Sequence, residues 1–247
     1  ASKQIKAMTG IETFEINATG DATITLTDVD DVTKVMLDDD GTAAVVTLAD
    51  LDVGTSIEVE HGVTASGVVI DLITSSAAAD SVAVDVKTTA NNAHTYSIAT
   101  AASNDIETLA LTMTDSSLID LSGLAYGTAL GTTAVTITGA GNATLSLVNA
   151  DVTTIDGSAM TGNLVITAKS SVDANTIKGG SGDDQLLHKN QSDILEGGTG
   201  TADLLTVDMT AIGKGLDIDL TSSSDQFTLG GVAGTSQSGF ESINLSQ

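Results

Sequence analysis

The chain has no cysteine, proline, tryptophan or arginine, and aromatic side chains make up only 2% of its 247 residues. Without cysteine there are no disulfides, no thiolate metal sites and no cysteine nucleophile. With so few aromatics, the core has to be built from Val, Ile, Leu and Ala. Aromatic platforms for stacking sugar rings are scarce for the same reason.

Positive charge is also scarce. Eight basic residues face 33 acidic ones, which gives a net charge of −25, and 26 of the 33 acids are Asp. No basic patch can displace counterions from phosphates, so nucleic-acid binding is excluded, and binding to anionic membranes is disfavoured. Asp is a good turn residue and a good ligand for hard cations such as calcium.

Several familiar signatures are absent. No apolar run approaches the roughly 18 residues of a membrane span, so we expect no membrane insertion. No basic segment followed by an apolar one marks a classical signal peptide. Because the sequence begins without Met, we expect a processed product or a piece of a longer protein. Neither a His-Glu-x-x-His motif nor a Gly-x-Ser-x-Gly motif is present, and we predict no enzymatic activity.

Short strand-like runs fill the chain, for example "DATITLTDV", "AAVVTLADL", "SVAVDVKT" and "NATLSLVNA". Most alternate with period two, and Gly, Asn, Asp or Ser clusters separate them. This pattern predicts an all-β protein with many short strands. Only "TAASNDIETLALTM" (100–113) and "SLIDLSGLAYGTAL" (117–130) could be brief helices.

A phrase with Glu before an aliphatic run occurs three times, as "GIETFEI" (10–16), "DIETLAL" (105–111) and "GFESINL" (239–245). Its Glu would mark the start of a strand. The copies do not follow a fixed period, so we interpret the phrase as a recurrent edge or layer element. The alternative is that a β-rich chain simply contains similar strand-forming segments several times.

A second repeat has a fixed period of nine. "GGSGDDQLL" (179–187) is followed by "HKNQSDILE" (188–196) and "GGTGTADLL" (197–205). Asp184 and Asp193 share the sixth position, and aliphatic residues recur near the eighth. The third block departs from this spacing, with one extra residue before Asp203. The pattern is that of the calcium-binding nonapeptide of the β-roll.

In such a roll, the first six residues of a block turn the chain and the last three form a strand. Two blocks complete one coil, so the loops 179–184 and 197–203 should stack on one side, with "HKNQSD" opposite. A calcium ion between the stacked loops could take carboxylate and glycine carbonyl oxygens. The candidate ligand positions are Gly179, Ser181, Gly182, Asp184, Gly197, Thr199, Gly200 and Asp203, and Asp193 is a further candidate in the glycine-free loop, which also carries Lys189. A Gly/Asp-rich turn pair that binds nothing is the alternative.

A weaker candidate lies nearer the N-terminus. In "LDDDGT" (37–42), Asp38 and Asp40 are two residues apart before a glycine, which resembles half of a calcium loop. Two such carboxylates can share one cation. A solvated turn is the alternative for this segment.

The nonapeptides resemble those of the RTX (repeats-in-toxin) proteins, and the Thr/Ala/Val-rich sequence around them is similar to S-layer proteins of the Caulobacter type. Phrases such as "IETLALT", "GNLVITAKSS" and "FESINLS" carry the second resemblance. It implies a calcium-dependent β-solenoid, type I secretion through an uncleaved C-terminal signal, and a two-dimensional lattice on the surface of a Gram-negative bacterium.

We therefore predict a parallel β-solenoid with a solenoid or β-repeat region (1–160), a calcium β-roll (161–210) and a continuing or capping region (211–247), which could also form one continuous domain. The expected function is a secreted, self-assembling surface-layer protein or module, with itself as partner and outer-membrane polysaccharide as a further candidate. The alternatives are a calcium-stabilised adhesin or biofilm-matrix module, and the non-catalytic part of a secreted polysaccharide-modifying enzyme.

Overall fold

The computed structural model describes most of the chain. It covers residues 2–29, 31–38, 43–61, 66–72, 80–88, 95–101, 106–124, 133–167, 169, 174–190, 192–209, 216–229 and 237–246.

The described residues form two long parallel sheets and one short hairpin. The 11-stranded sheet contains, in order, β1 (Ser2–Met8), β3 (Ala22–Val29), β5 (Val45–Leu51), β7 (Ser66–Leu72), β9 (Thr95–Thr100), β11 (Ser117–Leu121), β13 (Ala143–Val148), β15 (Leu164–Ile166), β17 (Gln185–His188), β19 (Leu204–Asp208) and β23 (Ser242–Ser246). The 10-stranded sheet contains β2 (Thr13–Asn17), β4 (Lys34–Asp38), β6 (Ser56–His61), β8 (Ser81–Thr88), β10 (Thr108–Met113), β12 (Thr133–Gly139), β14 (Val152–Met160), β16 (Thr176–Lys178), β18 (Ile194–Glu196) and β22 (Gln237–Ser238). The antiparallel hairpin consists of β20 (Leu216–Ile218) and β21 (Phe227–Leu229).

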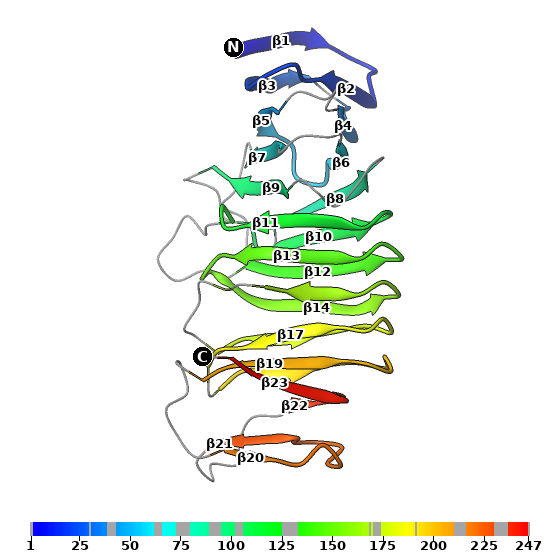
Figure 1. The fold of residues 1–247 in the computed structure, drawn as a ribbon. Helices are drawn as coiled ribbons and strands as arrows, with labels where there is room; N and C mark the ends of the chain where they lie inside the picture. The colour runs from blue at the N-terminus through cyan, green and yellow to red at the C-terminus, as the bar shows by residue number, and fades with distance from the viewer. Residues whose placement is uncertain are drawn as a thin grey trace.

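Consecutive strands alternate between the two sheets, so each coil contributes one strand to each sheet (Figure 1). The all-β fold and the parallel β-solenoid are thus as the sequence predicts. No helix in the described part of the chain is long and apolar enough to cross a membrane.

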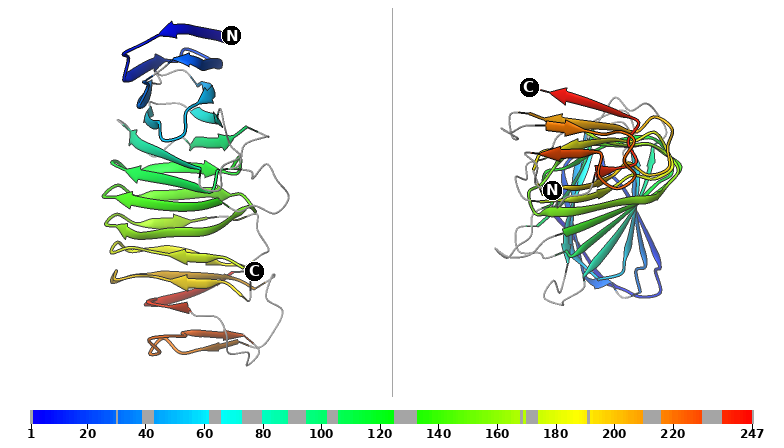
Figure 2. Two further views of the ribbon diagram at one scale, coloured as in Figure 1. Left: turned by 180° about the vertical axis from the view of Figure 1, so that it is seen from behind. Right: turned by 90° about the horizontal axis from the view of Figure 1, so that it is seen from below.

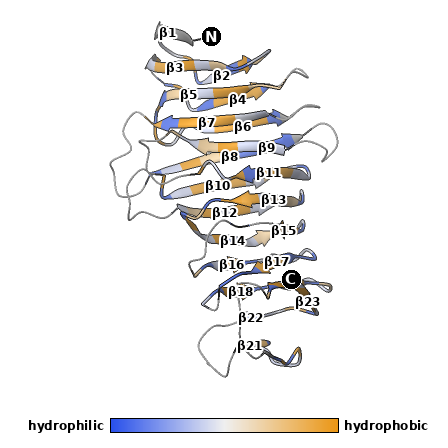
Figure 3. Ribbon diagram, turned by 60° about the vertical axis from the view of Figure 1, so that its left-hand side comes forward, coloured by the Kyte–Doolittle hydropathy of each residue, from blue (hydrophilic) through white to orange (hydrophobic). Residues whose placement is uncertain are grey.

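The core is a stack of aliphatic layers between the sheets, and hydrophobic residues recur along the stacked strands (Figure 3). Ile57, Val84, Leu111 and Ile137 occupy one such column, since each is paired in register with the next and none is more than 1% exposed. Burying an aliphatic side chain of this size contributes about 1.5–3 kcal/mol. Branched side chains of similar size repeat from coil to coil without gaps, which is why the core needs few aromatics.

The two segments that could have been helices contain strands instead. β10 lies in the first and β11 in the second, and both show alternating burial. In "TLALTM" and "SLIDL" the alternate inward residues join the aliphatic columns, and this tertiary packing outweighs any local helix tendency. Residues 102–105 and 125–130 of these segments lie outside the described residues.

Both sheets run without a break across residue 160, and the coils become shorter in the nonapeptide region. Thr136 in β12 pairs with Asp156, twenty residues on, whereas Thr176 in β16 pairs with Ile194, eighteen residues on. After β19 the hairpin β20–β21 is inserted, and β23 then pairs with β19 (Figures 1 and 2). Phe227 and Phe240 are each 2% exposed, so this last region closes the C-terminal end of the core with aromatic side chains.

Candidate metal centre

The loops 179–184 and 197–203 lie against each other, since they lead into the paired strands β17 and β19. A third turn, 239–241, leads into β23 on the same side. We call these three turns the Asp184 side. Residues 189–190 and 192–193 lead into β18 in the other sheet and lie on the opposite side of the solenoid, which we call the Asp193 side. This is the arrangement that the nine-residue period predicts.

Three acidic side chains tie the turns of the Asp184 side together. The backbone N–H of Leu164 donates to Oδ1 of Asp184 at 2.6 Å, and the N–H of Asp184 donates to Oδ1 of Asp203 at 2.7 Å. The N–H of Asp203 in turn donates to Oε2 of Glu241 at 2.7 Å. Asp184 also accepts from the N–H of Gly180 in its own loop, at 2.6 Å. Each carboxylate therefore satisfies the backbone of the preceding coil.

The extra residue in the third block does not displace Asp203. Gln185 pairs with Leu204, so the two Asp residues directly before them are aligned across the coils. Oδ1 of Asp183 accepts from both Thr201 N–H and Ala202 N–H, each at 3.1 Å. The loop 197–203 accommodates its extra residue at this point.

Two of these carboxylates are buried without a positive partner. Asp184 is 1% exposed and Asp203 is 0% exposed, and Oδ2 of Asp203 has no hydrogen-bond partner. The ion pairs among the described residues include neither of them, nor Glu241. Burial raises the pKa of Asp184 to about 6, and burial also raises the pKa of Asp203. A buried carboxylate in this condition is stabilised by a cation.

Glycines allow the loops to approach closely enough for backbone oxygens to line the turns. A Cβ on Gly179 would overlap the carbonyl oxygen of Gly197, and one on Gly200 would overlap that of Gly182. A Cβ on Gly182 would lie 2.6 Å from the carbonyl oxygen of Gly162. Larger residues could not stack here in register.

Ser181 and Thr199 are hydrogen-bonded to the preceding coil. Their N–H groups donate to the carbonyl oxygens of Met160 and Gly180, at 3.1 and 2.9 Å, and both residues are at the surface. Oγ of Ser181 also donates to the carbonyl oxygen of Met160, at 3.3 Å.

The structure does not bring Asp193 to the other candidates. Its carboxylate lies on the Asp193 side, where it is 0% exposed and accepts from three backbone N–H groups, those of Asn175, Lys189 and Asn190, each at 2.9 Å. The ammonium of Lys169 lies 3.5 Å from both of its oxygens.

The N-terminal candidate is only partly described. Asp38 is half-buried at the end of β4, where it is paired with Asn17 and Glu60 in the sheet. Asp40 lies outside the described residues. Across the described ranges, no three His, Asp or Glu side chains are grouped to hold a metal ion by themselves. A cation on the Asp184 side would therefore need backbone carbonyl oxygens as well, which calcium accepts readily.

Sequence reasoning missed a further series of linked polar side chains, in the turns that lead into β11, β13, β15 and β17. Oγ of Ser116 accepts from the N–H of Asn142, Oδ1 of Asn142 from Asn163, and Oδ1 of Asn163 from Asp183, at 3.1, 2.8 and 3.0 Å. The signal was present in "GAGNATL", "MTGNLVI" and "GSGDDQL", which share a turn with a Gly followed by Asn or Asp. The turn repeat thus begins upstream of the nonapeptides.

In two of its three copies, the recurrent Glu phrase also links neighbouring coils through a side-chain oxygen that accepts a backbone N–H. Oε2 of Glu107 accepts from the N–H of Asp80 at 2.7 Å, just as Glu241 accepts from Asp203. The carbonyl oxygens of Asp80 and Asp203 then each accept two N–H groups from the Glu-containing turn of the next coil, all at 3.1 Å. Glu12 lies in the first turn, where its own carbonyl oxygen accepts from Thr33 and Lys34.

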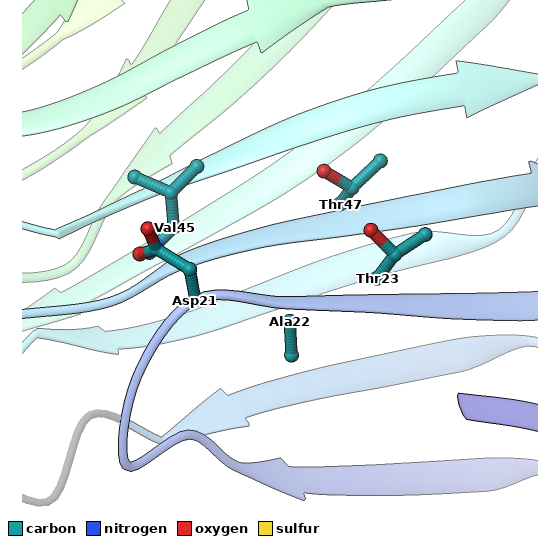
Figure 4. A pocket seen from close by; sticks show the side chains of 5 residues that line it. All are labelled: Asp21, Ala22, Thr23, Val45 and Thr47. Carbon is teal, nitrogen blue, oxygen red and sulfur yellow. The ribbon is translucent and has the colours of Figure 1, made fainter. Parts of the chain in front are cut away.

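A pocket also lies on the outer face of β3 and β5, lined by Asp21, Ala22, Thr23, Val45 and Thr47 (Figure 4). Oδ1 of Asp21 accepts from the N–H of Val45 at 2.9 Å, so this carboxylate already connects two coils. We assign no ligand to it.

No known protein family, curated protein or solved structure matches this chain. Any function must therefore be inferred from its own residues.

Proposed function

We propose that this chain is a calcium-dependent structural protein of a bacterial cell surface, a subunit or module of a self-assembling surface layer. The observation that carries the proposal is the pair Asp184 and Asp203: two buried carboxylates in adjacent turns, with Oδ2 of Asp203 lacking any partner. The donor chemistry fits calcium, because carboxylate and carbonyl oxygens are the ligands that this ion prefers.

Asp184 and Asp203 would hold the ion, with Gly179, Gly197 and Gly200 permitting the close approach of the loops. Calcium would supply positive charge where the fold places negative charge. With a net charge of −25, the chain repels both itself and its copies. The parallel solenoid supports this role, since its coils stack through backbone bonds and need only local neutralisation at the turns.

The free energy of calcium binding is large enough to change the stability of the chain substantially. Extracellular calcium sites have dissociation constants of about 10⁻⁴–10⁻³ M. In roughly 10 mM calcium, one such site adds about 1.4–2.7 kcal/mol to the free energy of unfolding. Proteins are stable by only about 5–15 kcal/mol, so a few sites supply a large fraction of the stability of the chain. At low calcium inside the cell the chain would be only marginally stable, and it would therefore unfold readily for secretion.

The test is light-scattering mass during a calcium titration that starts from chelator. We expect the mass to rise beyond that of a monomer at millimolar calcium, with no rise in magnesium. Asp203→Asn should abolish the rise, whereas Asp21→Asn, which removes one charge but keeps an acceptor oxygen for Val45, should not. If calcium compacts a monomer that never associates, the adhesin or matrix module replaces the surface layer. If calcium changes neither mass nor compactness, the whole proposal fails.

A further inference from the structure

The sixth-position aspartates of the first two nonapeptides make the same hydrogen bonds on opposite sides of the solenoid. Oδ1 of Asp184 accepts from Leu164 of the preceding coil, and Oδ1 of Asp193 accepts from Asn175 of the preceding coil. Oδ2 of each accepts from the N–H at the second position of its own loop, which is Gly180 or Lys189. Both carboxylates are essentially inaccessible to solvent.

The two sides differ in charge. Lys169 places its ammonium 3.5 Å from both oxygens of Asp193, and the two side chains are 1% and 0% exposed. Lys169 belongs to the preceding coil, where it forms a bridge with Val148. Its position is fixed further by Lys189, whose Nζ donates to the carbonyl oxygen of Lys169 at 2.9 Å. On the Asp184 side, no ion pair of the described residues reaches Asp184 or Asp203.

We propose that Lys169 is a resident cation that neutralises Asp193 in place of an external ion, so that only the Asp184 side of the solenoid requires calcium. The calcium requirement of the Asp184 side rests on the proposed function, whereas the neutralisation of Asp193 by Lys169 does not. An ammonium against both carboxylate oxygens repels a divalent cation from the same position. Isolated buried charges are strongly unfavourable, so Lys169 and Asp193 depend on each other.

The arrangement would divide the roll into two halves with different requirements. The buried carboxylate of Asp193 would be neutralised at any calcium concentration. Turns on the Asp184 side would hold two uncompensated carboxylates until an external cation arrives. At low calcium the Asp193 side would then stay ordered, and the turns of the Asp184 side would become ordered when calcium binds.

The first experiment needs no calcium. Thermal unfolding in chelator is measured for the wild type, Lys169→Met, Asp193→Asn and the double variant. We expect each single variant to lower the melting temperature by roughly 6–20 °C, because it leaves one buried charge alone. The double variant should recover a large part of that loss. Lys178→Met is the matched control, since Lys178 pairs with Glu196 at 3.3 Å on an exposed surface and should change little.

The second experiment counts calcium ions by calorimetric titration with calcium chloride. Lys169→Met should bind one more calcium than the wild type and regain its lost melting temperature as it does so. The double variant should bind no additional ion. If the single variants lose nothing in chelator, or if the double variant is as unstable as Lys169→Met, the pairing is overturned. If the pairing holds and the wild type binds no calcium, only the proposed function fails. If Lys169→Met folds in neither condition, the double variant decides, and its failure to fold overturns the pairing.

Discussion

The backbone N–H of Asp184 donates to the side chain of Asp203, one coil further along the chain, at 2.7 Å. The later aspartate thus fixes the backbone of the earlier one, and each leads into one of two neighbouring strands. This contact holds two carboxylates close together in a region that water does not reach. The stability of this region should therefore depend on what neutralises them.

In metal-free solution, protons should neutralise the buried carboxylates of Asp184 and Asp203. Burial raises the pKa of Asp184 to about 6 from an ordinary value of 3.8. The folded state therefore holds this proton more tightly than the unfolded state, so the stabilisation is complete below pH 3.8 and is lost as the pH rises through 6. Asp184 should lower the free energy of unfolding by at most about 3 kcal/mol between pH 4 and pH 7. Urea unfolding of the wild type and of Asp184→Asn measures this. Equal pH dependence in the two proteins would contradict the prediction.

Close stacking of the glycine turns predicts a position-specific penalty. Gly182→Ala puts a Cβ 2.6 Å from the carbonyl oxygen of Gly162 and 2.7 Å from Oδ1 of Asn163, so the turns must separate. We expect a loss of about 1–3 kcal/mol in the free energy of unfolding. The control is Thr199→Ala, because Thr199 is exposed in the neighbouring turn and its substitution adds no atom between the stacked turns. Equal losses from the two substitutions would show that stacking is not the cause.

The Glu phrase predicts that an acceptor oxygen matters more than a charge. Glu107→Ala removes the acceptor of the Asp80 N–H, and Asp80 is only 2% exposed. An N–H that loses its partner in such a place costs about 1–3 kcal/mol. Glu107→Gln keeps an oxygen at the same reach and should retain most of the stability. Chemical denaturation of the two variants compares them directly, and an equal loss from both would indicate that the charge is what counts.

The fold followed from the sequence because every strand carries its own signal. Alternating Val, Ile, Leu and Thr gave the strands, and the nine-residue period gave the stacking of the loops that contain Asp184 and Asp203. The roles of Asn142 and Asn163 did not follow, since a capping contact between coils depends on which turns become neighbours, and coil lengths vary outside the nonapeptides. Lys169 could not be connected with Asp193 for the same reason: it lies one coil away in a segment without a repeat.

A group of ion pairs on the outer face of the 10-stranded sheet should contribute less to stability at high salt and at low pH. Glu58, in β6, accepts from Lys34 at 2.7 Å and also from Lys87, each on a neighbouring strand. Burial by itself would raise the pKa of Glu58, but the two lysines outweigh it and lower the pKa below 4.5. The contribution is therefore present above pH 4.5 and disappears as the pH falls through the lowered value. Glu58→Gln should cost about 1 kcal/mol at neutral pH and low salt, and less at 1 M salt. A loss independent of salt would argue against the ion pairs.

The aromatic closure at the C-terminal end gives a prediction that can be followed at a single residue. Phe227 packs its ring 5.1 Å from that of His188, and burial lowers the pKa of His188 to about 4 from 6.5. Neutral His188 therefore makes the fold less stable as the pH falls below 6.5, until it takes up its proton near 4. Phe227→Ala opens this end of the core and should cost about 3–5 kcal/mol. It should also admit water to the imidazole, so that its pKa, followed by NMR, rises toward 6.5. Leu220→Ala changes the same hairpin at a side chain that is 41% exposed and should leave both quantities unchanged. If Phe227→Ala leaves the His188 titration where it is, the hairpin does not seal the end of the solenoid.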